Sequence, residues 1–95
     1  MKSGNAHDFI DHATYEEVAV MYQGVKYFFY GLILNSEGRY SFDIDIWDTD
    51  GNAVQTVFSG TFNSKDDCMS VFENSKIFNG KTFWEAEKDM EWVEW

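Results

Sequence analysis

Carboxylates are the side chains of this sequence with the clearest chemical potential, and several of them gather in residues 43–52 (DIDIWDTDGN). Runs of Asp, Asn and Gly are typical of calcium-binding loops. If Gly51 took the place of the loop glycine, the first and last ligand positions would fall on Ile46 and Val57, where Asp and Glu are needed. The segment therefore predicts a hairpin turn and no calcium site.

Soft metal ligands and nucleophiles are sparse. His7, His12 and Cys68 are the histidines and the cysteine of the chain, and none of them has CxxC or HxxxH spacing. Cys68 occupies an apolar position of a predicted helix, where thiols are usually unreactive. The glycine motifs that hold phosphates, GxGxxG and GxxxxGKS/T, do not occur. We therefore expect no metal, no cofactor and no catalytic residue, and a protein that is not an enzyme.

The spacing of the carboxylates imitates that of phosphates. Asp43 and Asp45 would project from one face of a strand about 6.6–6.8 Å apart, and Glu87 and Glu91 would stand about 6 Å apart along a helix. Duplex DNA advances about 3.4 Å per phosphate along each strand, so two steps match either spacing. The strands and helices of any acidic protein show similar spacings, however, so the excess of acids carries most of this argument.

Aromatic side chains at positions that look exposed are the other candidate feature. Trp47 lies on the polar face of its predicted strand, and Trp92 falls outside the predicted core stripe. Tryptophan is favoured as an anchor of protein interfaces. The other aromatic residues at such positions are Phe28, Tyr30, Trp84 and Trp95. The alternative is that the N-terminal segment covers Phe28 and Tyr30, and that the terminal tryptophans fold back onto the core.

Charge and composition limit the class of partner. The chain has 17 acidic and 7 basic residues, a net charge of −10, and 19% aromatic residues. The aromatic content predicts a folded protein rather than a disordered acidic segment. Without a basic patch, the chain is not expected to bind nucleic acid directly, and anionic membranes would repel it. No stretch approaches 18 apolar residues, so we expect no membrane span.

The elements expected to position these residues form one domain over residues 1–95. Cys68 is the single cysteine, which favours a reducing, cytoplasmic compartment. Residues 5–12 predict a short helix, and alternation of apolar and polar residues predicts strands thereafter. The predicted strands are residues 15–22, 25–34, 39–48 and 53–62, the first two joined by a tight turn at Gln23-Gly24.

The last third of the chain has helical periodicity. Ser64 is a good N-cap for a helix that places Cys68 on its apolar stripe. Thr82 and Glu85 predict a capping box that opens a second helix. Its sheet-facing side would consist of Phe83, Ala86, Met90 and Val93, and its solvent side of Glu87, Glu91 and Glu94. The expected fold is α+β: a four-stranded antiparallel β-meander with C-terminal helices packed on one face and a short N-terminal helix.

These patterns predict a small acidic inhibitor that binds the basic nucleic-acid-binding surface of a partner protein, as a nucleic-acid mimic. In kind, although not by any motif, it is similar to phage-encoded anti-restriction and anti-CRISPR proteins. The alternative is a toxin-immunity or accessory protein that binds a basic partner through an aromatic-acidic patch without mimicry. A homodimer is left open. The residues expected to bind the partner are Asp43, Asp45, Trp47, Asp48, Asp50, Glu87, Glu91, Trp92 and Glu94.

Overall fold

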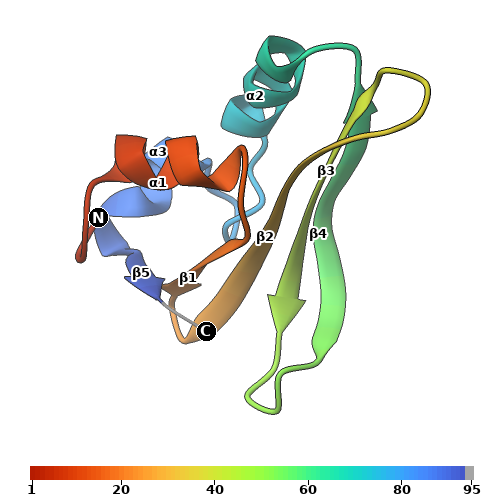
Figure 1. The fold of residues 1–95 in the computed structure, drawn as a ribbon. Helices are drawn as coiled ribbons and strands as arrows, with labels where there is room; N and C mark the ends of the chain where they lie inside the picture. Colours follow the sequence, from red (N-terminus) through yellow and green to blue (C-terminus); the bar gives the residue numbers. More distant parts are fainter. Residues whose placement is uncertain (94–95) are drawn as a thin grey trace.

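The predicted meander is present in the computed structural model, which describes residues 1–93. It consists of β1 (Val18–Tyr22), β2 (Val25–Leu34), β3 (Tyr40–Trp47) and β4 (Ala53–Phe62). Each strand pairs antiparallel with the next along the chain (Figure 1). The α+β class predicted from the sequence is confirmed.

The C-terminal region differs from the prediction. The helix α3 spans Phe83–Ala86, a 3-10 turn follows over Glu87–Asp89, and the chain then becomes extended as β5 (Glu91–Val93). β5 pairs antiparallel with β1, which makes a five-stranded sheet of order β4-β3-β2-β1-β5. The prediction that the second helix would continue through Val93 is wrong, because these residues satisfy the outer edge of β1 instead.

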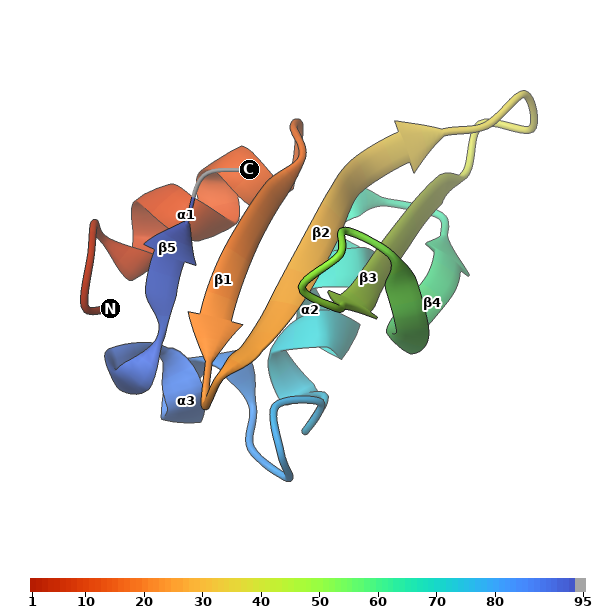
Figure 2. The ribbon, with the colours of Figure 1, turned by 90° about the horizontal axis from the view of Figure 1, so that it is seen from below.

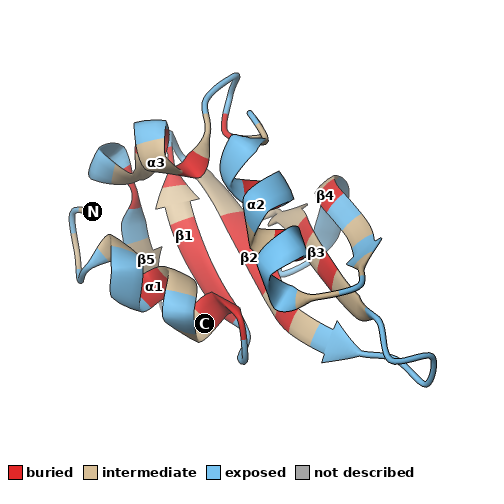
Figure 3. Cartoon of the chain, turned by 90° about the horizontal axis from the view of Figure 1, so that it is seen from above, coloured by how far each residue is buried: buried red, intermediate tan, exposed pale blue. Residues whose placement is uncertain are grey.

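The three α-helices within residues 1–93 lie on one side of the sheet. They are α1 (Ala6–Ala13), α2 (Lys65–Asn74) and α3, and they lie behind the strands in Figure 2 and in front of them in Figure 3. The Asn5 side chain accepts from two backbone amides in the first turn of α1, and Ser64 caps α2 as predicted. α1 therefore covers the sheet together with the C-terminal helices.

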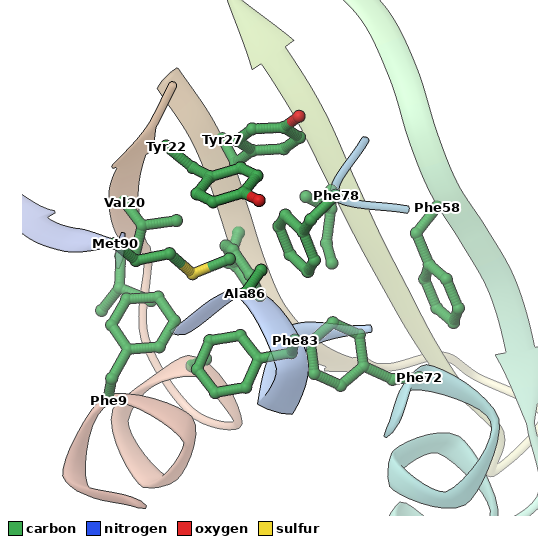
Figure 4. Close-up of a cluster of buried hydrophobic side chains, with 14 of the residues drawn as sticks. Phe9, Val20, Tyr22, Tyr27, Phe58, Phe72, Phe78, Phe83, Ala86 and Met90 are labelled. Carbon is green, nitrogen blue, oxygen red and sulfur yellow. The ribbon is translucent and has the colours of Figure 1, made fainter. Parts of the chain in front are cut away.

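The core between the helices and the sheet is mostly aromatic (Figure 4). The rings of Phe29 and Phe72 meet edge to face with centroids 5.9 Å apart, and Phe9 stacks on Phe83 at the same distance. Phe78 fills the space beside Tyr27, with centroids 4.9 Å apart. Aromatic residues bury a large area per side chain, so a short chain can build a sufficient core from them.

One turn and one bulge determine which side chains face away from the helices. Gln23 and Gly24 both have positive φ, 53° and 76°, as a two-residue hairpin turn requires. Gly31, at φ 84°, lies in an irregularity of the β2–β3 pairing, and a Cβ there would lie 3.3 Å from the backbone oxygen of Glu16. This extra residue keeps Leu32 on the core side, opposite Phe42.

Candidate functional site

Among residues 1–93, no helix covers the second side of the sheet. Side chains alternate along a strand, so the strands that send Phe29 and Ile44 into the core send their neighbours to this other side. We call this surface the open face. Its central side chains are Lys26, Phe28, Tyr30, Asp43, Asp45, Trp47, Thr56 and Ser59.

An aromatic stack lies at the centre of the open face. The rings of Phe28 and Trp47 are parallel to within 15°, with centroids 4.4 Å apart. Tyr30 tilts against the other side of Phe28 at 4.9 Å, and the Lys26 ammonium lies 5.9 Å from the Trp47 ring. Phe28 is only 1% exposed, although no helix of the described chain covers it. Neighbours on the open face therefore contribute to burying Phe28, and Trp47 is the half-buried outer layer.

Hydrogen bonds connect this stack to the carboxylates. The Trp47 Nε1 donates to the Tyr30 hydroxyl at 3.1 Å, and that hydroxyl donates to the Asp45 carboxylate at 2.9 Å. Thr56 donates to the second oxygen of Asp45 at 2.7 Å. Burial raises the pKa of Tyr30, and the nearby carboxylates of Asp45 and Glu17 raise it further. The phenol is therefore held neutral, as a donor that orients Asp45.

Asp43 completes the acidic part of the open face. Its carboxylate accepts a hydrogen bond from Ser59 on β4 at 2.6 Å. Asp43 and Asp45 line a hollow of about 320 Å³, together with Tyr30, Ile33, Thr56 and Ser59. A larger hollow of about 530 Å³ lies beside Trp47 at the end of β3 and reaches Asp48 and the turn after it. Both hollows are wide enough to accept a protruding side chain of a partner.

The predicted acids of the β3–β4 turn continue this surface. Asp48 accepts at one carboxylate oxygen from the backbone amides of Asp50 and Asn52, both at 2.9 Å. The turn between two strands that was predicted for this segment is confirmed, and Asp48 holds it together. Asp50 is exposed at its tip. The structure thus brings Asp43, Asp45, Trp47, Asp48 and Asp50 together along one strand and its turn.

The C-terminal candidates do not form the predicted helical row. Glu87 lies in the 3-10 turn, where it accepts from the amino group of Met1 at 2.6 Å. Glu91 lies in β5 opposite Met21, on the side of the sheet that bears the open face. The prediction that Glu87 and Glu91 lie along one helix with a phosphate-like spacing is therefore wrong. Glu94 and Trp95 lie outside the described residues.

Trp92 is half-buried and packs against the edge of the core. It is opposite Val20, and its ring meets Phe9 edge to face with centroids 5.3 Å apart. The His12 ring lies 5.2 Å from it on α1. The prediction that Trp92 falls outside the core is wrong, because β5 directs this side chain toward α1. Trp84 is likewise half-buried, with its ring 4.8 Å from that of His7.

Sequence reasoning missed the hydroxyl groups that position the acids. The sequence patterns single out Tyr30 for its ring and not for its hydroxyl, and they do not single out Thr56 or Ser59. The pairing of Asp45 with Thr56 and of Asp43 with Ser59 depends on the register of β3 and β4, which includes two irregularities. Thr56 and Ser59 are three residues apart, so simple alternation would place them on opposite sides of the sheet. The register shift between Ile44 and Asp45 brings both of them opposite the acids of β3, and no local signal in the sequence indicates that shift.

The histidine and cysteine side chains that could bind a soft metal ion lie apart from the open face. Cys68 is buried in the core, and burial raises the pKa of its thiol to about 11. His12 is on α1, with its Nδ1 2.8 Å from the Glu16 carboxylate. Within residues 1–93, no three His, Cys, Asp or Glu side chains are grouped so that they would hold a metal ion.

No helix in the described part of the chain has the length and apolar character needed to cross a membrane. Comparison of the chain with protein-family models, with curated proteins and with solved structures finds no match.

Proposed function

We propose that this protein is a small acidic inhibitor that binds a basic surface of a partner protein through its open face. The observation that carries the proposal is the position of the Trp47–Phe28 stack directly beside Asp43 and Asp45. Stable interfaces combine an aromatic anchor with a polar rim. Hydrogen bonds from Tyr30 and Ser59 hold the carboxylates in place, so little side-chain entropy is lost when a partner docks.

The electrostatic balance favours a basic partner. The ion pairs among residues 1–93 join the Met1 amine to Glu87 and His12 to Glu16. The charges of Asp43, Asp45 and Asp50 are therefore available to a partner. Charge of this size accelerates encounter with a basic surface, whereas the residence time depends on buried contacts. The single cysteine, Cys68, agrees with a cytoplasmic place for this interaction.

A specific patch explains the geometry better than general mimicry of nucleic acid. The acids best placed for binding, Asp43 to Asp50, are confined to β3 and its turn. This favours a toxin-immunity or accessory protein that recognises one basic site. Mimicry remains the second candidate, because Asp43 and Asp45 follow one another on one side of β3 with a rise of about 6.6–6.8 Å. A partner that uses the same site to bind nucleic acid would make use of this spacing.

The proposal is tested by comparing immobilised variants as capture reagents for basic proteins from a cell lysate. We expect Trp47→Ala and the double variant D43N/D45N each to lose the proteins that wild type retains. The matched control, D66N/E73Q, removes the same charge from exposed positions on α2 and should retain them. If D66N/E73Q loses binding as much as D43N/D45N does, a specific patch is contradicted. If Trp47→Ala retains the full set, the aromatic anchor is contradicted.

The two candidates differ in their response to nucleic acid. For mimicry, duplex DNA added to the retained partner should displace this protein, because the two would share one site. For a separate patch, DNA and this protein should bind the partner together. Raising the salt concentration should weaken binding in both cases, more steeply for mimicry, where more charges are paired.

A further inference from the structure

The two edge strands of the sheet, β5 and β4, differ in how far other parts of the chain cover them. Within the described residues β5 spans Glu91–Val93, and the N-terminal segment runs beside it. Ser3 bridges Glu91, and its hydroxyl donates to the Trp92 carbonyl at 3.1 Å and accepts from the Trp92 amide at 2.9 Å. The Lys2 amide donates to the Met90 carbonyl at 2.8 Å. The described part of this edge is therefore covered.

The opposite edge, β4, is long and lacks the usual protection. β4 has ten residues, and within the described chain it pairs with β3 and with no other strand. Alternate backbone amides and carbonyls of such an edge point away from the sheet. Natural proteins commonly protect edges with charged side chains or proline. β4 contains neither, although a quarter of the chain is charged.

Irregular pairing protects only the first half of β4. The two register shifts of the β3–β4 pair fall between Ile44 and Asp45 and between Ile46 and Trp47. Bulges of this kind twist an edge away from a second strand. From Phe58 to Phe62, in contrast, the pairing with β3 is unbroken. A regular template of five residues is therefore open to another strand.

The distribution of charge indicates which strand could pair with residues 58–62. Two copies of a chain with net charge −10 repel each other over most of their surfaces. They can meet with least repulsion where the surface carries no acid, and residues 58–62 carry none. Two charged side chains contact this segment. The Asp43 carboxylate on β3 accepts from the Ser59 hydroxyl at 2.6 Å, and the Arg39 guanidinium donates to the Thr61 carbonyl at 3.2 Å and to the Asn63 side chain at 3.1 Å, so one charge of each sign lies beside residues 58–62.

We infer that two copies of this chain join their β4 edges antiparallel over Phe58–Phe62, about a two-fold axis at Gly60. Phe58 then lies opposite Phe62 of the second copy, and Ser59 lies opposite Thr61. Phe58 and Phe62 already stack within one chain, with centroids 6.3 Å apart, because Gly60 between them has no side chain. Each copy adds the same pair, so four rings form one apolar row across the interface.

This arrangement makes one sheet of ten strands. A two-fold axis that relates paired antiparallel strands is perpendicular to the sheet, so both open faces lie on the same side. The dimer would present two copies of Asp43, Asp45 and Trp47 in one plane. A partner with two basic sites would then be bound with an avidity that one copy lacks.

Sedimentation equilibrium from micromolar to millimolar protein, at low and high salt, tests the dimer. We expect wild type to dimerise, and more strongly at high salt, because salt screens the repulsion between the copies. Thr61→Glu should weaken association about tenfold, because it places a charge twice in the interface. The matched control is Ser70→Glu on α2, which adds the same charge at an exposed position away from β4 and should weaken it much less. A monomer under all conditions, or equal weakening by both variants, overturns the proposal.

Hydrogen exchange of wild type at low and high concentration tests the location without any substitution. Amides of residues 58–62 that point away from β3 should exchange more slowly in the concentrated sample. Protection of another segment, such as β5 or the β3–β4 turn, would assign the contact elsewhere and overturn the β4 interface.

Discussion

The indole of Trp47 lies flat on the ring of Phe28, with centroids 4.4 Å apart and 15° between their planes. The two residues are diagonal neighbours on β3 and β2, because Trp47 is opposite Lys26 and Phe28 is opposite Asp45. The pair lies on the side of the sheet away from the described helices. Trp47 thus covers Phe28, and in the proposed function the same indole also presents a surface to a partner.

Replacing Trp47 separates these roles. Trp47→Ala should lower the free energy of unfolding by about 1–3 kcal/mol, because it uncovers part of Phe28 and removes a stacked pair. Trp47→Phe retains a ring and should cost less stability, while losing the indole N–H that reaches Tyr30. Urea denaturation followed by circular dichroism measures both. A Trp47→Ala variant as stable as wild type would contradict the importance of the stack for burial.

Tyr30 links the aromatic and acidic parts of the open face. Tyr30→Phe removes one donor and one acceptor, and should lower the free energy of unfolding by about 1 kcal/mol. The fold raises the pKa of this phenol, so its contribution to stability is present below the ordinary tyrosine pKa and is lost as the pH rises through the raised value. Ultraviolet titration should show one late-ionising phenol fewer in Tyr30→Phe. Loss of a phenol that ionises in the ordinary tyrosine range, with the late-ionising phenols unchanged, would contradict this environment for Tyr30.

Gly60 allows Phe62 to fold back toward Phe58. A Cβ at position 60 would lie 2.7 Å from the Phe62 Cζ, so Gly60→Ala should push the ring out and cost about 1 kcal/mol. The loss should disappear when Phe62 is also replaced by Ala, because the clash is then absent. A double-mutant cycle of Gly60→Ala and Phe62→Ala, measured at low protein concentration, checks this coupling. Additive effects would rule it out.

The capping box of α3 predicts that the stability of the protein falls at low pH. Thr82 accepts from the Glu85 amide, and the Glu85 carboxylate accepts from the Thr82 amide. These bonds hold the pKa of Glu85 below its usual range, so its stabilising effect is present above that range and lost as the pH falls through the lowered pKa. Thr82→Ala should cost about 1 kcal/mol near neutral pH and raise the Glu85 pKa measured by NMR. Thr56→Ala, outside α3, should leave that pKa unchanged.

Cys68 should resist alkylation in the folded protein. Its side chain is buried and the pKa of its thiol is about 11, so the thiolate is scarce and covered near pH 8. Iodoacetamide should react only at the rate of unfolding, and fully in urea. Because the pKa is raised, the share of stability due to Cys68 is lost as the pH rises from about 9 toward 11. Rapid labelling without denaturant would contradict this burial.

The meander could be predicted from local patterns, whereas the last strand could not. Alternation in Tyr40–Trp47 and the Gln23-Gly24 turn carry their information within a few residues. The spacing of Phe83, Ala86 and Met90 fits a helix, and all three are buried as that pattern predicts. Their burial does not require a continuous helix, however. β5 forms because β1 offers an unpaired edge, a tertiary effect that a helical period does not reveal.

The part of the candidate site that lies on β3 could also be predicted from a local pattern. Asp43, Asp45 and Trp47 share a face because strands alternate, which needs no knowledge of the neighbours. That Phe28 is covered on the open face, and that Tyr30, Thr56 and Ser59 bind the acids, depends on strand order and register. The irregularities opposite Asp45 and Trp47 shift that register, so counting residues from the turn would have given the wrong partners.

The pairing of β5 with β1 has a consequence for the order of folding during synthesis. β1 to β4 are joined by short connections, so closing each pair costs little chain entropy. β1 gains its second neighbour only when residues 91–93 have been synthesised. The contacts of Phe9 on α1 with Trp92 and Phe83 also need residues that follow the meander in sequence. Synthesis from the N-terminus therefore completes the strands of the meander before the half of the core under α1 can close.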